Sequence, residues 1–100
     1  MRPTRVLGPR FYPGKSIDVY LFPGSLVIEF REGHRERGRG FSALSQAFYV
    51  LEYDDIAKVT LEGDEVVLRL ETGETLRLEV DEPRKLYEDL VRILLSIGKL

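Results

Sequence analysis

Glycine, lysine and serine stand together at Gly14-Lys15-Ser16, a combination that ends the phosphate-binding loop of many nucleotide-binding proteins. That loop places its first glycine one residue closer than Gly8 lies to Gly14. It is also followed by a helix whose N-terminus binds the phosphate, whereas residues 17–22 alternate as in a strand. We therefore expect no nucleotide binding here.

Two other places carry titratable side chains without a geometry for catalysis. Asp54 and Asp55 are neighbours in a turn, and adjacent side chains on an extended segment point apart rather than converge on a substrate. His34 is the only histidine, and the chain has no cysteine to help it bind a metal. Because no nucleophile, metal cluster or cofactor fingerprint is found, the sequence predicts no catalytic residue, no metal, no cofactor and no enzyme.

The segment 31–40 is the strongest candidate for a binding surface. Guanidinium groups suit phosphate or carboxylate, and glycines let a loop approach a partner closely. Phe41 follows the segment and adds an aromatic ring. Partner binding here, to protein first, nucleic acid second and anionic lipid third, stands beside the alternative of a merely solvated loop. The charged and titratable candidates in this segment are Arg31, His34, Arg35, Arg37 and Arg39.

The charge distribution bears on the choice of partner. Residues 1–40 hold eight Lys or Arg and four Asp or Glu, while residues 41–100 hold seven and thirteen. A net charge of −2 gives little support to phosphate neutralisation, so nucleic-acid binding through the arginine segment stays the alternative. A domain polarised in this way can orient a charged partner or a second copy of itself.

Aromatic side chains provide a second candidate surface. Tyr20, Phe22 and either Tyr49 or Phe48 are predicted to face outward, which is more than solvation requires and indicates a self-association or docking interface. Further stacking surface is expected from Tyr12 and Tyr53.

Apolar and polar residues alternate over much of residues 17–80, which is the period of β-strands. The first hairpin is expected to pair Leu21 with Leu26 across a four-residue loop, and Ala47–Tyr53 reads as another strand. Residues 1–16 look like an irregular arm with one short strand around Arg10–Tyr12.

The stretch 57–80 predicts a three-stranded meander. A two-residue turn at Gly63-Asp64 sets Leu61 opposite Val66, and a turn with Gly73 in the left-handed region sets Leu68 opposite Leu76. The other face of the meander is expected to be solvated; it carries Val67, Arg69, Arg77 and Glu79.

A helix is predicted over 82–97. Asp81-Glu82-Pro83 is a helix start signal, and Gly98 is a stop signal. The apolar stripe must be buried against the sheet; it consists of Leu86, Leu90, Ile93, Leu94 and Ile97. The fold class is mainly β, with six or seven antiparallel strands in a bent sheet or partly open barrel capped by one C-terminal amphipathic helix.

Residues 53–59, Tyr-Asp-Asp-Ile-Ala-Lys-Val, are similar to the entry into the last meander of small archaeal and bacterial pleckstrin-homology (PH)-like domains. The order of strands and helix over 17–97 resembles the same superfold. The resemblance implies a partly open barrel plugged by the helix and a role as a binding module. The loop that is basic in lipid-binding members is here Phe22–Ser25 without Lys or Arg, so inositol phospholipid is not an expected ligand.

Length and composition set the remaining bounds. A hundred residues form one domain spanning 1–100, and no stretch reads as a signal peptide or membrane span, so we expect a cytoplasmic protein. The absence of Asn and Cys with 32% charged residues fits a heat-adapted source. We predict a protein-binding adaptor or scaffold that self-associates or serves a larger assembly such as a cytoskeletal filament.

Overall fold

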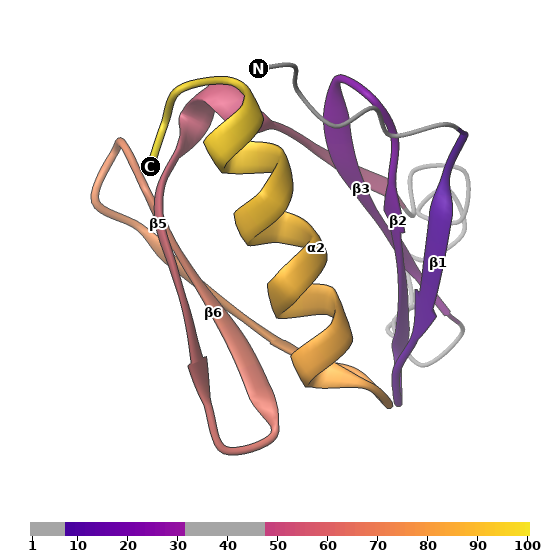
Figure 1. Ribbon diagram of the computed structural model, residues 1–100. Helices are drawn as coiled ribbons and strands as arrows, with labels where there is room; N and C mark the ends of the chain where they lie inside the picture. The colour runs from indigo at the N-terminus through magenta and orange to yellow at the C-terminus, as the bar shows by residue number, and fades with distance from the viewer. Residues whose placement is uncertain (1–7, 32–47) are drawn as a thin grey trace.

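The computed structural model describes residues 8–31 and 48–100. These residues form seven antiparallel strands, divided between two sheets, and a helix, α2, that follows them (Figure 1). The elements are β1 (Arg10–Pro13), β2 (Ile17–Leu21), β3 (Ser25–Phe30), β4 (Phe48–Glu52), the short 3-10 helix η2 (Tyr53–Asp55), β5 (Ile56–Glu62), β6 (Glu65–Leu70), β7 (Thr75–Glu79) and α2 (Pro83–Ser96).

The first sheet has the order β1-β2-β3-β4 and the second the order β5-β6-β7. Within each sheet, every strand pairs with its neighbour in sequence, so both sheets are meanders. The two sheets are not closed into a barrel. The predicted mainly-β class with one C-terminal helix is confirmed.

The predicted strand registers are confirmed at each hairpin. Leu21 lies opposite Leu26, Leu61 opposite Val66, and Leu68 opposite Leu76. Gly73 has φ +101°, a conformation that residues with a Cβ rarely adopt. The short strand expected around Arg10–Tyr12 is β1, which pairs with β2.

Val67 was predicted to be solvated, and that prediction is wrong. Val67 is only 8% exposed because it belongs to β6, the middle strand of the second sheet. Its cross-strand neighbours are Thr60 and Arg77, and the long stem of an arginine covers apolar surface beside it.

Helix α2 lies between the two sheets (Figure 1) and packs directly on β5 and β6. Proline at the first helical position needs no hydrogen-bond acceptor for a backbone N–H, which suits the observed start at Pro83. The buried stripe contains Leu86, Leu90, Ile93 and Leu94. Ile97 was expected in this stripe but is 43% exposed, because the helix ends at Ser96 and Ile97 caps it with a non-helical ψ of 10°.

One hydrophobic core contains residues of both sheets and of α2. A polar contact crosses it, since the Tyr12 hydroxyl on β1 donates to a carboxylate oxygen of the buried Asp89 on α2. The other carboxylate oxygen of Asp89 accepts from Arg92 at 2.8 Å. This arrangement satisfies a buried carboxylate and fixes the helix against β1.

The two sheets meet at the main chain beside Gly14. Gly14 forms an isolated antiparallel bridge with Val80, and the Asp81 N–H donates to the Pro13 carbonyl at 2.8 Å. A Cβ on residue 14 would collide with the carbonyl oxygen of Glu79 and lie 3.3 Å from the Cα of Val80. The absence of a side chain at Gly14 therefore permits this close approach.

Gly14→Ala should lower the free energy of unfolding by about 1–3 kcal/mol, because the new methyl group can be accommodated only by separating two backbones. Gly24→Ala is the matched control, since a Cβ there meets nothing within 4 Å. Chemical denaturation of the two variants measures the difference. Equal stability of the two would show that the contact at Gly14 is loose.

Candidate functional site

A continuous row of apolar side chains crosses the outer face of the first sheet, the face turned away from the core. In the strand register Phe11 lies opposite Tyr20, Tyr20 opposite Val27, and Val27 opposite Val50. Directly opposed residues on antiparallel strands lie side by side on one face of the sheet. The row therefore spans all four strands.

Both ends of this row are well exposed, with Phe11 at 52% and Val50 at 60%, while Tyr20 and Val27 are half-buried. The ring centroids of Phe11 and Tyr20 are 5.2 Å apart, and those of Tyr20 and Phe22 are 6.3 Å apart, distances at which aromatic rings attract one another. We call this surface the apolar face; it comprises Phe11, Tyr20, Phe22, Val27, Phe48 and Val50.

Carboxylates lie beside the row of the apolar face. The Tyr20 hydroxyl donates to Oε1 of Glu29 at 2.9 Å, and this hydrogen bond to a carboxylate raises the pKa of Tyr20. Asp18, which pairs with Glu29 across the strands, accepts from Arg31 at 2.8 Å. The polar groups beside the rings are thus the negative carboxylate of Glu29 and the carboxylate of Asp18, whose charge is balanced by Arg31.

Arg31 was a predicted partner-binding residue, and the structure shows it bonded within the molecule. Besides Asp18, its guanidinium donates to the backbone carbonyls of Gly14 and Ile17. These bonds fix the end of β3 against the β1–β2 turn, so Arg31 has fewer donors left for an external phosphate. The other candidates of that segment lie outside the described residues: His34, Arg35, Arg37, Arg39 and Phe41.

The aromatic candidates are divided between the two faces of the first sheet. Tyr20 and Phe22 come together on the apolar face, whereas Tyr49 lies opposite Ile28 on the inner face. Of the two alternatives for β4, Phe48 is the outward residue, 56% exposed. Phe11, Val27 and Val50 were not singled out from the sequence.

Tyr12 and Tyr53 were predicted to provide stacking surface, and this is wrong because both are buried. Tyr12 turns inward from β1 to reach Asp89. Tyr53 begins η2, at the corner where β4 passes into β5, and its hydroxyl donates to the Phe22 carbonyl at 2.7 Å. Both tyrosines therefore serve the fold: Tyr12 connects β1 to α2, and Tyr53 connects η2 to the residue that follows β2.

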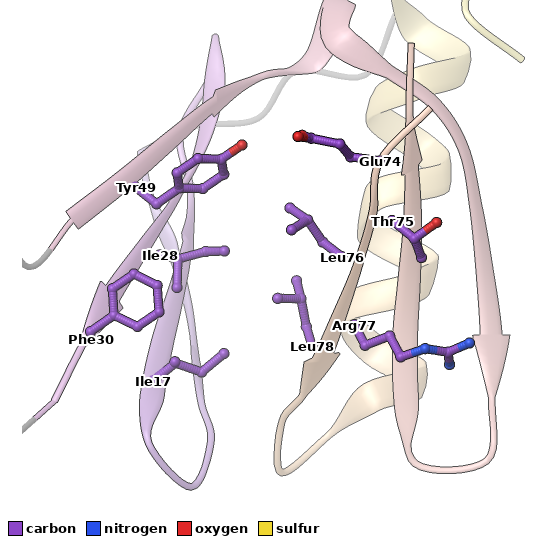
Figure 2. Close-up of a pocket in the computed structure, with 9 residues that line it drawn as sticks. All are labelled: Ile17, Ile28, Phe30, Tyr49, Glu74, Thr75, Leu76, Arg77 and Leu78. Carbon is purple, nitrogen blue, oxygen red and sulfur yellow. The ribbon is translucent and has the colours of Figure 1, made fainter. Parts of the chain in front are cut away.

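The inner face of the first sheet opens into a groove of about 610 Å³ beside β7. Figure 2 shows Tyr49 and Phe30 on one side and Leu76 and Leu78 on the other, while Arg77 points away from the groove. Arg77 instead contacts the carboxylates of Glu62 and Glu65. The walls are mainly apolar, with the carboxylate of Glu74 at the rim.

Gly14-Lys15-Ser16 does not have the form of a phosphate-binding loop. It leads into β2 rather than into a helix, and the Lys15 ammonium lies 3.8 Å from a carboxylate oxygen of Glu79. The close approach of the Gly14 backbone to Val80 explains why a glycine is needed at position 14.

Within residues 8–31 and 48–100, no group of three or more His, Asp and Glu side chains is placed to hold a metal ion. The same residues contain no helix with the length and apolar character needed to cross a membrane. Protein-family models, curated proteins and solved structures were compared with the chain, and none matched. The apolar face is the site that the geometry itself offers.

Tyr53 lies at the corner between β4 and β5 and helps to hold β4 in position. Its contribution to the free energy of unfolding should depend on alkaline pH. Burial raises the pKa of Tyr53 above its usual value of about 10. The folded state keeps this proton to a higher pH than the unfolded state. Tyr53 therefore contributes its full stability below about pH 10 and loses it as the pH rises further.

Tyr53→Phe should reduce the free energy of unfolding by about 0.5–1.5 kcal/mol near neutral pH, through loss of the bond to the Phe22 carbonyl. The deficit relative to the wild type should shrink above about pH 10. Urea denaturation of both proteins across that range provides the measurement. A constant deficit would mean that Tyr53 ionises equally easily in the folded protein.

Proposed function

We propose that this domain is a non-enzymatic protein-binding module, an adaptor or scaffold that docks on other proteins through the apolar face. The observation that carries the proposal is the unbroken row from Phe11 to Val50, exposed at both ends and crossing every strand of the first sheet. Aromatic residues are enriched at protein interfaces, and the rims of such interfaces are polar.

The chemistry of the apolar face favours protein over nucleic acid. Asp18, Glu29 and Glu52 share the face with the rings, and negative groups repel a phosphate backbone. Arg31 is already bonded to Asp18. Nucleic-acid binding through segment 31–40 is the competing proposal, and it is supported by the sequence of that segment alone.

Magnitudes indicate how much of the face a partner has to cover. Full burial of one large apolar side chain contributes about 1.5–3 kcal/mol, whereas association costs about 4 kcal/mol or more in lost freedom. One residue therefore cannot hold a partner, but several residues of the row buried together can. This argues for a partner that covers the sheet across its strands.

The order of four strands, three strands and a helix supports our further proposal that the domain is PH-like. Domains of that superfold mostly serve as binding modules, which agrees with the role proposed here. The β2–β3 connection contains no basic residue, so we do not propose an inositol phospholipid as the ligand. We place the domain in the cytoplasm, since a cysteine-free chain needs no oxidising compartment, and regard a larger assembly such as a filament as its setting.

The test combines partner capture with face variants. A partner retained by the wild-type domain from its source cells is identified, purified and titrated against the wild type, Phe11→Lys, Val50→Lys and the double variant. Each lysine should weaken binding at least about tenfold, because an ammonium group buried without a partner is costly. Leu95→Lys on α2 is the matched control, since the 56% exposure of Leu95 lies between those of Phe11 and Val50 but the residue lies away from the face.

Equal affinity of the double variant and the wild type would overturn the proposed surface. A strictly monomeric protein that retains no partner would overturn protein binding altogether. Binding of a short single-stranded RNA at low salt that is lost at high salt would support the arginine segment instead.

A further inference from the structure

Among residues 8–31 and 48–100, the two sheets have four edge strands, and three of these strands carry features that discourage pairing with another chain. β1 contains Arg10 and ends at Pro13, which lacks a backbone N–H. β5 has an irregular register between Ile56 and Lys58. β7 alternates Thr75, Arg77 and Glu79 along its outward face.

β4 is the exception among these edges. Its sequence, Phe48-Tyr49-Val50-Leu51-Glu52, contains no Lys, Arg or Pro, and its pairing with β3 is regular throughout. Phe48, Tyr49 and Val50 are 56%, 37% and 60% exposed. Among the described residues, β4 pairs only with β3, so alternate backbone groups along it face away from the sheet. A regular, apolar edge of this kind is a template for strand addition.

We propose that β4 pairs antiparallel with β4 of a second copy of this chain, about a two-fold axis that passes beside Val50. This inference rests on the proposed protein-binding function and names one partner for it. A closed two-fold contact uses the same strand from each copy, so a single unprotected edge is enough. The product is one continuous eight-stranded sheet formed from the two four-stranded sheets.

The register follows from the side chains of β4. An axis beside Val50 pairs all five strand residues and sets Phe48 opposite Glu52 of the second copy. An axis beside Glu52 would instead bring two carboxylates together, which is unfavourable. With Val50 on the axis, Tyr49 gains the apolar Leu51 of the second copy as its neighbour on the inner face.

The pairing also extends the apolar face. The row from Phe11 to Val50 ends at β4, and in the dimer it continues from Val50 of the second copy toward that copy's Phe11. A partner would then meet a row of twice the length. Because association costs about 4 kcal/mol or more, a doubled row lets shallow contacts add up to stable binding.

Single cysteines test the pairing cleanly, because the chain has no cysteine of its own. Directly opposed residues of antiparallel strands have Cα atoms about 4.5–5.5 Å apart, within reach of a disulfide. Val50→Cys should therefore form a disulfide-linked dimer under mild oxidation at micromolar protein. Phe48→Cys should not, since its two copies would be about 13 Å apart along the strands.

Leu95→Cys, equally exposed on α2, measures cross-linking by random collision. Dimer formation by Val50→Cys at least about tenfold faster than by the other two variants supports the pairing, as does a wild-type dimer in sedimentation. Equal rates for Val50→Cys and Leu95→Cys would overturn it, and faster cross-linking of Phe48→Cys would overturn the register.

The variant Phe11→Lys separates this inference from the proposed function. Phe11 lies on β1, at the opposite edge of the sheet from β4, so a lysine there should leave the cross-linking of Val50→Cys unchanged. Loss of partner binding with retained cross-linking supports both proposals. Retained partner binding in a protein that never cross-links overturns the β4 pairing while leaving the protein-binding module intact.

Discussion

The fold depends on burying the apolar stripe of α2 in the space that the two sheets leave open. In the described part of the chain, α2 is the helix that packs between the sheets, and the core is one cluster to which both sheets and this helix contribute. Leu86, Leu90 and Leu94 are fully buried in it. The bond from Tyr12 to Asp89 adds a directional contact to this non-directional packing. Together they hold the first sheet in place, with its outer side turned away from the core.

The two faces of the first sheet have different roles. Its inner face supplies part of the core and one wall of the groove beside β7, while its outer face carries the well-exposed Phe11, Phe48 and Val50. β4 joins the two, since Tyr49 faces the groove and Val50 faces outward from the same short strand. A contact along this strand can therefore influence both surfaces at once.

Local patterns predicted most of the secondary structure. Alternation and turn residues give the hairpin registers, because a shift by one residue would move every side chain to the opposite face. The burial of Tyr12, Tyr53 and Val67 could not be predicted in this way. It depends on which elements lie above each side chain, and that is decided by the packing of strands distant in sequence.

The candidate site was predictable to a similar degree. Tyr20 and Phe22 could be assigned to the outer face because their strand alternates clearly. β4 is apolar at four successive positions, so the sequence leaves Phe48 and Tyr49 equivalent until pairing with β3 decides between them. Phe11 stands between prolines at positions 9 and 13, where no periodicity can be read. Its contact with Tyr20 appears only once β1 is paired.

The position of α2 after all seven strands has a consequence for biosynthesis. A ribosome releases the chain from its N-terminus, so both meanders emerge before the segment that seals them. Hairpins form within microseconds, whereas translation adds only about 5–20 residues each second. The nascent chain therefore passes through an interval in which the strands of both sheets have emerged without the helix that buries their apolar sides, and chaperones that shield apolar surface would act in that interval.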